Sequence, residues 1–202
     1  GLSDLAKGEK RTYLLFSLAA ACFHYSAFVL PLLTFFGSRP LTLRGRLVIG
    51  AIPLLGYLLF FGGFDPIASL PIPWIQEKLW IYERLRDSGM AGDAINVFNI
   101  VYVMRLLVFY LLLWKYDVIK EQAPNLSLLL KVFAISYFCF TALGALPVMA
   151  FRYAELFGVV EIVMVPYLAL TMKPEAFGKS LVIVFAFGCM MLNVCLLYTS
   201  PS

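Results

Sequence analysis

Ionisable side chains lie inside several long apolar stretches of this 202-residue sequence, where a charge is costly and seldom accidental. His24 falls near the middle of the first such stretch. An imidazole surrounded by hydrocarbon must hydrogen-bond to something: a substrate hydroxyl, a proton-relay partner or a neighbouring helix. The sequence leaves His24 open between a chemical role and helix packing alone.

Arg105 and Glu161 occupy the interiors of two later apolar stretches. A guanidinium keeps its charge, so Arg105 must extend to the membrane surface, face a polar cavity or pair with a carboxylate. Glu161 and Glu155 are the two candidate partners. A carboxylate as deep as Glu161 is expected to be either paired or protonated.

Arg152 and Glu155 are three residues apart, so a helix would bring both side chains to one face. The planar fork of an arginine suits the oxygens of a phosphate, and Arg152 could clamp a pyrophosphate-linked lipid in this way. The alternative is structural: an arginine that marks the end of a span and forms a salt bridge within its own helix.

The segment 62–96 differs from the rest because it carries acidic residues, prolines and two tryptophans. Within it, residues 74–87 show the spacing of an amphipathic helix, which the tryptophans would hold at the headgroup level. Tyr82, Glu83, Arg84 and Arg86 form its polar side. They are either a binding surface for sugars and lipid headgroups or an ordinary solvated face.

The amino-acid composition predicts the kind of structural elements that must position these groups. The chain is 62% hydrophobic and 14% charged, with a mean hydropathy of +0.88. So few charges exclude a water-soluble enzyme, and so many aromatic side chains exclude a disordered chain. We therefore expect an all-α, polytopic transmembrane helix bundle of about six spans with one interfacial amphipathic helix. The expected spans are 13–36, 47–61, 97–116, 128–150, 152–170 and a last one from residue 180.

Other features narrow the chemistry. The sequence has no nucleophile–base motif, glycine-rich phosphate loop or HExxH, so it predicts no metal, no cofactor and no hydrolase or kinase site. Its basic residues are scattered, which argues against nucleic acid. The four cysteines are expected to be buried and unpaired. Lys and Arg divide eight to seven between the two sides of six spans, so charge leaves the orientation open.

The first residue and the last eight residues predict that this sequence differs from the natural protein at both ends. Residues 195–202, CLLYTSPS, resemble a translated sequencing adapter, and the chain begins with Gly1. We therefore expect one transmembrane domain over residues 1–194, forming the C-terminal part of a longer protein, with 195–202 as an artefact.

Two stretches resemble the EpsG-like family, relatives of the O-antigen polymerases. Residues 18–31, LAAACFHYSAFVLP, are similar to its FHxSAxxxLP helix, and residues 151–157, FRYAELF, with Glu161 and 165–167, VPY, are similar to its late helix. Between them, Lys78 and Tyr82 fill a loop segment that typically contains a Lys/Tyr pair. The resemblance covers most of residues 13–170, and family members have further N-terminal spans.

The resemblance implies an enzyme that joins lipid-linked oligosaccharide repeats into exopolysaccharide, capsule or O-antigen at the bacterial cytoplasmic membrane. The implied partners are a polyprenyl-pyrophosphate-linked oligosaccharide, membrane lipid and other polysaccharide-assembly proteins. Such a transfer needs cations for the departing pyrophosphate and a base for the acceptor hydroxyl. The resemblance implies that Arg152 binds the phosphate, that His24 contacts the acceptor hydroxyl or acts as its base, and that Glu155 orients Arg152. Tyr82 and Arg84 would contact sugar or headgroup. The alternatives are a transporter or flippase component and a non-catalytic scaffold.

Overall fold

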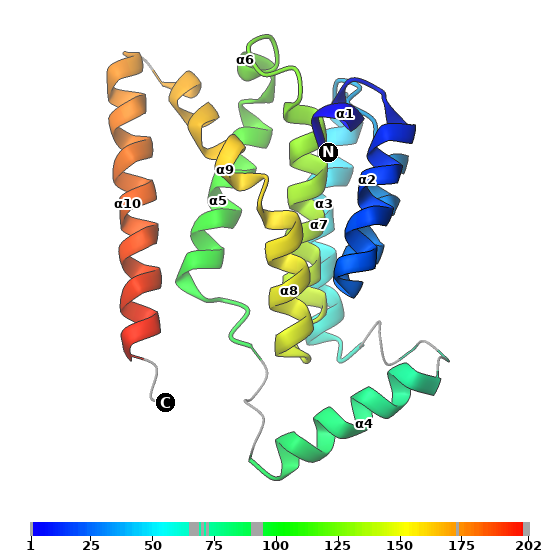
Figure 1. The fold of residues 1–202 in the computed structure, drawn as a ribbon. Helices are drawn as coiled ribbons and strands as arrows, with labels where there is room; N and C mark the ends of the chain where they lie inside the picture. Colours follow the sequence, from blue (N-terminus) through cyan, green and yellow to red (C-terminus); the bar gives the residue numbers. More distant parts are fainter. Residues whose placement is uncertain are drawn as a thin grey trace.

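Helices make up all the regular secondary structure in the described part of this computed structural model, which comprises residues 2–64, 69, 71, 73–89, 95–172 and 174–199 (Figure 1). In chain order they are α1 (Leu2–Ala6), α2 (Lys10–Phe23), the 3-10 helix η1 (Tyr25–Phe35), α3 (Leu43–Phe61), α4 (Pro73–Asp87), α5 (Ile100–Trp114), α6 (Tyr116–Ile119), α7 (Leu126–Ala142), α8 (Pro147–Gly158), α9 (Glu161–Met164), the 3-10 helix η2 (Val165–Thr171) and α10 (Glu175–Thr199). The all-α prediction is confirmed for these residues.

Helices α3, α5, α7, α8 and α10 run side by side between two ends of a bundle (Figure 1). One end, called here the α6 end, carries α1 and α6. The other, the α4 end, faces α4, which lies across it as expected for an interfacial helix. The helix predicted for 74–87 is therefore confirmed with nearly its expected bounds.

Helix α7 is the centre of the bundle, because 13 of its 17 residues are buried. It packs against α3 on one side and α8 on the other. A side chain at Gly56 of α3 would bring its Cβ within 3.3 Å of the Phe138 Cα on α7. Glycine thus permits the close backbone approach that stabilises helix pairs in membranes.

The first predicted span, 13–36, is wrong, because the chain reverses inside it. Helix α2 ends at Phe23, His24 is extended (φ −147°, ψ 121°), and η1 returns along α2. The Tyr13 hydroxyl donates to the Leu30 carbonyl at 3.0 Å, which fixes the two arms side by side. Residues 10–35 therefore form a helical hairpin, called here the His24 hairpin, whose two ends both lie at the α6 end (Figure 1).

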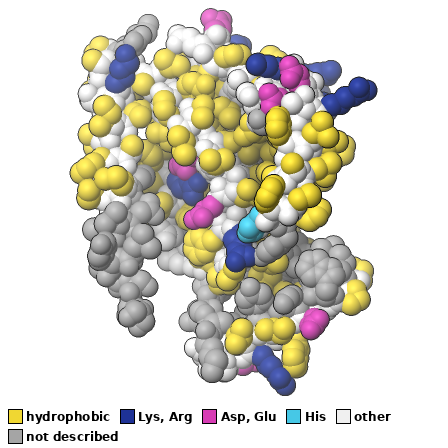
Figure 2. Space-filling model, viewed as in Figure 1, with side chains coloured by type: hydrophobic (Ala, Val, Ile, Leu, Met, Phe, Trp, Pro, Cys, Tyr) yellow, Lys and Arg dark blue, Asp and Glu magenta, His cyan; other side chains and the backbone are white. Residues whose placement is uncertain are grey.

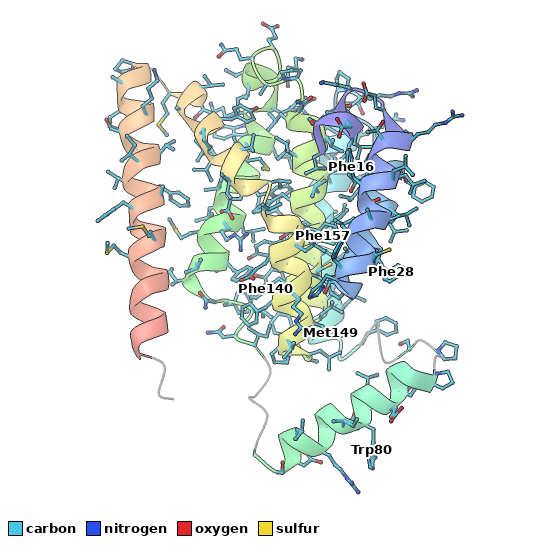
Figure 3. All side chains as sticks on the ribbon, viewed as in Figure 1. Phe16, Phe28, Trp80, Phe140, Met149 and Phe157 are labelled. Carbon is cyan, nitrogen blue, oxygen red and sulfur yellow. The ribbon has the colours of Figure 1, made fainter. Side chains whose placement is uncertain are left out.

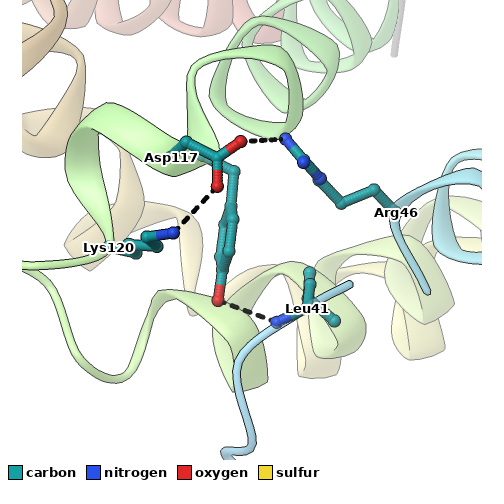
Figure 4. A network of polar contacts seen from close by, with 5 residues as sticks. Leu41, Arg46, Asp117 and Lys120 are labelled. Atoms are coloured by element: carbon teal, nitrogen blue, oxygen red, sulfur yellow. Dashed lines mark hydrogen bonds and ion pairs between the residues drawn. The ribbon is translucent and has the colours of Figure 1, made fainter. Parts of the chain in front are cut away.

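Side chains at the α6 end tie the hairpin's exit to α6 and α3 (Figure 4). Asp117 pairs with Lys120 at 3.0 Å and with Arg46 at 2.8 Å, and these cations hold its pKa below the usual value for an aspartate. The backbone N–H of Leu41 donates to the Tyr116 hydroxyl at 3.0 Å.

Three other boundaries differ from the prediction. The break expected at 151 lies at 143–146: α7 ends at Ala142, Gly144 follows it, and Pro147 begins α8. The last helix begins at Glu175 rather than at 180, and α3 begins at Leu43, four residues earlier than expected. Glycine commonly follows the end of one helix, and proline commonly occupies the first turn of the next. These two residues mark the boundary here, whereas the charge of Arg152 does not.

One described helix, α3, is long and apolar enough to cross a bilayer alone. The segments Pro147–Gly158 and Glu161–Thr171 pass the same test together, with a bend of 41° between them. The prediction of about six spans is therefore not confirmed. Large apolar side chains nevertheless cover the sides of the bundle (Figure 2), including Phe23, Trp114 and Ile162, which are 92%, 73% and 74% exposed. Such a surface fits lipid better than water.

Candidate functional site: a polar face beside the His24 hairpin

His24 stands at the tip of the hairpin, in the turn between α2 and η1, and its side chain is exposed. Its Nδ1 atom accepts a hydrogen bond from the backbone N–H of Ser26 at 3.2 Å, which caps η1. The backbone N–H of His24 donates to the Ala20 carbonyl at 3.0 Å, so the same residue also ends α2. The structural role that the sequence left open for His24 is therefore real.

Arg152 lies in the middle of α8 and Glu155 one turn further on, and both side chains are exposed. Packing holds this helix on its opposite side. The Ser136 hydroxyl of α7 donates to the Ala154 carbonyl at 2.5 Å. Ala150 and Ala154 are completely buried, so the backbone of α8 lies close to α7.

An aromatic cluster supports the start of α8. The rings of Tyr102 and Phe140 stack with centroids 3.4 Å apart, and Phe151 contacts both of them edge-on, its centroid 5.8 Å from that of Phe140. Figure 3 labels Phe140, which belongs to α7, and Met149, which lies near the start of α8. Phe151 directly precedes Arg152, so the cluster fixes the backbone that carries the guanidinium.

Arg105 pairs with Glu161, the partner named among the sequence alternatives. The Arg105 Nε and Glu161 Oε2 atoms are 2.5 Å apart, and the side chains are only 14% and 19% exposed. The guanidinium also lies over the rings of Tyr102 at 4.9 Å and Phe133 at 5.7 Å. Glu161 begins α9, so this pair ties α5 to the bend that follows α8.

These groups share one face of the molecule. Figure 2 shows the chain's one histidine with basic and acidic side chains gathered in the middle of this face, between α8 and the tip of the hairpin. The described charged residues of α8, α5 and α9 are Arg152, Glu155, Arg105 and Glu161. The face therefore presents an exposed cation, carboxylate and imidazole beside a paired and half-buried ion pair.

The interfacial candidates are described only in part. Arg84 is exposed, and its guanidinium lies 4.1 Å from the ring centre of Trp80. The side chains of Lys78 and Tyr82 lie outside the described part of the structure. Trp80 is 53% exposed, so this cation–aromatic pair is on the surface of α4.

Sequence reasoning missed several residues that shape the site. The Arg105 guanidinium lies over the ring of Tyr102. Gly158 leaves space for this guanidinium, since a Cβ at position 158 would lie 2.6 Å from Arg105 Nη2. Tyr102 and Gly158 each lie three residues from a member of the ion pair, which is the spacing that could have revealed them. Cys22 is exposed and Cys139 half-buried; both are unpaired, so the expectation of burial is wrong for Cys22.

Comparison with known proteins gives one match. No curated protein and no solved structure matches the chain. The family model of the EpsG family matches residues 1–201, nearly the whole chain. The chain therefore belongs to the EpsG family, as the two sequence motifs indicated, and this membership indicates a membrane protein related to polysaccharide biosynthesis.

Proposed function

We propose that this protein is a multi-pass polymerase of the bacterial cytoplasmic membrane. It would join lipid-linked oligosaccharide repeats in exopolysaccharide, capsule or O-antigen synthesis. The observation that carries the proposal is that the chain's one histidine lies among basic and acidic side chains over α8 (Figure 2), whose charged residues, Arg152 and Glu155, are both exposed. Its partners would be the polyprenyl-pyrophosphate-linked oligosaccharide, the membrane lipid and other assembly proteins.

The distribution of positive charge supports a site on the outer side. Of the lysines and arginines that the structure describes, ten lie toward the α6 end, four toward the α4 end, and Arg105 between them. The sequence alone divided the lysines and arginines almost equally between the two sides. That near tie disappears because the hairpin brings Lys7, Lys10 and Arg11 to the same end as the loop that follows it. Basic residues remain on the cytoplasmic side, so the α4 end would face outward. The tip of the hairpin and the start of α8 point toward that end.

Cysteine labelling should test this orientation. In a Cys22→Ser background, Ser88→Cys should react with a membrane-impermeant maleimide in intact cells. Lys10→Cys and Glu121→Cys should react only after permeabilisation, because both lie at the α6 end. A crossing helix over 13–36 would instead put Lys10 and Glu121 on opposite sides, and that result would contradict the hairpin.

The chemistry of the face suits transfer of a sugar from a diphosphate. Arg152 would bind the diphosphate with two parallel N–H donors and stabilise the charge that develops on it. His24 and Glu155 are the two groups on the same face that can handle the acceptor proton. Arg105 and Glu161 already form an ion pair with each other, so their role would be to position α8 and the bend rather than to bind substrate.

Arg152→Ala in the full-length protein should lower polymer synthesis at least a hundredfold, because a preorganised donor to developing charge is worth about 10²–10³ in rate. The measurement is product length after supplying the reconstituted protein with a lipid-linked repeat unit. Arg44→Ala, an exposed arginine at the α6 end, is the matched control and should remain fully active. Normal polymer from Arg152→Ala would remove Arg152 from the site, and no polymer from the wild type would overturn the function.

Transport of a lipid-linked or anionic molecule is the second candidate. Secondary transporters bind substrates where spanning helices are interrupted. The His24 hairpin and the 41° bend after α8 are interruptions of that kind. The two functions are separated by reconstituted vesicles: a transporter moves the labelled lipid-linked saccharide across the bilayer without lengthening it.

A further inference from the structure

We propose that Tyr57, Phe61 and Phe98, called here the aromatic platform, form a saccharide-binding subsite at the α4 end of the bundle. A sugar ring of the lipid-linked oligosaccharide would stack on Phe98. This inference deepens the proposed function and rests on it for the identity of the ligand. It adds a sugar contact to those expected from the sequence, which were Tyr82 and Arg84 of α4.

The three rings of the platform lie close together and nearly parallel. The ring centroids of Tyr57 and Phe98 are 5.2 Å apart with 15° between the ring planes, and those of Phe61 and Phe98 are 5.8 Å apart with 24° between the planes. The Tyr57 hydroxyl donates to the Val97 carbonyl at 3.0 Å, which fixes the segment that carries Phe98. Phe61 and Phe98 are both more than half exposed, so the platform offers flat apolar surface to a ligand.

The platform lies where two helices of the bundle end. Phe61 is the last residue of α3, and Phe98 lies two residues before α5 begins. Tryptophan and tyrosine are the usual aromatic residues at the ends of membrane spans, because each has a polar group that meets water. Phe61 and Phe98 have no such group, so they leave apolar surface exposed at this level, and a bound sugar ring would cover it.

Two asparagines beside Phe98 supply hydrogen-bond donors that suit a sugar. Asn96 Oδ1 accepts the backbone N–H of Phe98 at 3.0 Å, and Asn99 Oδ1 accepts the backbone N–H of Val101 at 2.9 Å. A backbone N–H can only donate, so these bonds fix which amide atom is the oxygen, and each N–H₂ group lies on the other side of its amide. Each N–H₂ group can donate to a saccharide hydroxyl next to the exposed ring.

A sugar ring suits this combination of groups better than a lipid tail does. A pyranose has a face of C–H groups, whose partial positive charge is attracted to the negatively polarised face of an aromatic ring. Its hydroxyls project from the rim of the ring and need hydrogen-bond partners. A prenyl chain has no hydroxyls, so it would contact the phenylalanines and leave the asparagines unused.

Ring contacts join the platform to the part of α8 that carries the proposed diphosphate site. The centroid of Tyr57 lies 6.2 Å from that of Tyr137, which lies 6.3 Å from that of Tyr102. The Tyr102 ring in turn contacts Phe151, the residue directly before Arg152, at 6.3 Å. One aromatic cluster therefore supports both the saccharide subsite and the backbone of Arg152, as a ligand made of a sugar joined to a diphosphate requires.

Substitutions of Phe98 test the platform without disturbing the core, because this side chain is exposed. The full-length protein in lipid nanodiscs would be titrated with the lipid-linked repeat unit and, separately, with polyprenyl diphosphate that carries no saccharide. Phe98→Ala and Phe98→Leu should each weaken binding of the saccharide-bearing lipid about tenfold, the loss expected for one stacking contact. Phe98→Trp should keep the wild-type affinity, and all three variants should bind polyprenyl diphosphate as the wild type does.

Phe177→Ala is the matched control, because Phe177 is exposed to the same extent as Phe98 but lies at the start of α10, at the α6 end. It should bind both lipids normally. Wild-type affinity in Phe98→Leu would show that the side chain makes only apolar contact with lipid. An equal loss for both lipids would show that it contacts the prenyl diphosphate. Either outcome overturns the proposal, as does a wild type that binds the two lipids equally.

Binding and polymer synthesis, measured on the same variants, separate this inference from the function on which it rests. Saccharide binding that depends on Phe98, in a protein that makes no polymer, would support the aromatic platform and overturn the polymerase function. Polymer synthesis by the wild type, with unchanged saccharide binding in Phe98→Ala, would overturn the platform and leave the function standing.

Discussion

Arg105→Leu should lower the unfolding temperature of the detergent-solubilised protein by about 10 °C, because it leaves the half-buried Glu161 carboxyl group without its partner. Removing one member of a buried ion pair costs about 3–5 kcal/mol. For a chain of this size each kcal/mol shifts the unfolding temperature by about 2–4 °C. Glu161→Leu should be similarly destabilising, since it strands the Arg105 guanidinium against the rings of Tyr102 and Phe133.

The double variant separates this explanation from general damage. Arg105→Leu with Glu161→Leu replaces both charges by apolar groups, which is often neutral for a buried pair. It should therefore recover most of the lost stability. Losses that simply add would show that the two side chains are not coupled.

Two glycine substitutions test the packing of the Arg105 guanidinium in a second way. Gly158→Ala would push a Cβ to within 2.6 Å of Arg105 Nη2 and 3.2 Å of Ser136 Oγ, so it should destabilise the protein although alanine favours helices. Gly188→Ala is the matched control, because nothing lies within 4 Å of its added Cβ. It should be neutral or slightly stabilising. Equal effects at the two positions would contradict the packed guanidinium.

The sequence was sufficient for the elements that depend on local pattern. The amphipathic period places an interfacial helix at 74–87, and the structure has it at Pro73–Asp87. The depth of Arg105 and Glu161 in apolar stretches made pairing one of the alternatives for each residue, and the structure has the two paired with each other. These inferences hold because periodicity and the cost of a buried charge act within one segment or between two recognisable groups.

The hairpin could not be predicted in the same way. An apolar run of 24 residues is long enough to cross a bilayer, so length favoured one span. The reversal depends on a side chain that caps the following helix, and a histidine in Cys22–Ser26 gives no indication of which backbone N–H it will meet. The count of lysines and arginines on the two sides then gave no orientation, because it assumed that residues 13–36 cross the membrane. The reversal at His24 therefore changes the topology of the whole chain.

Cutting the hydrogen bonds that hold residues 37–39 onto α7 should disable the site at the other end of the hairpin. The Lys131 ammonium donates to the Gly37 carbonyl and the Ser127 hydroxyl donates to the Arg39 carbonyl, each at 2.5 Å. These bonds fix the exit of η1, and η1 carries the tip where His24 is located. Ser127→Ala with Lys131→Leu should lower polymer synthesis more than tenfold.

The stability cost of that double variant should be modest, because one neutral and one charged hydrogen bond together contribute about 2–4 kcal/mol. Lys120→Leu is the matched control: it also removes one positive charge from the α6 end, but it breaks only a surface pair with Asp117. It should keep full activity and the same orientation. Loss of activity in the double variant alone, with unchanged cysteine labelling, would show that the α6 end positions the proposed site through the hairpin. Equal activity in both variants would show that the hairpin holds its place without these bonds.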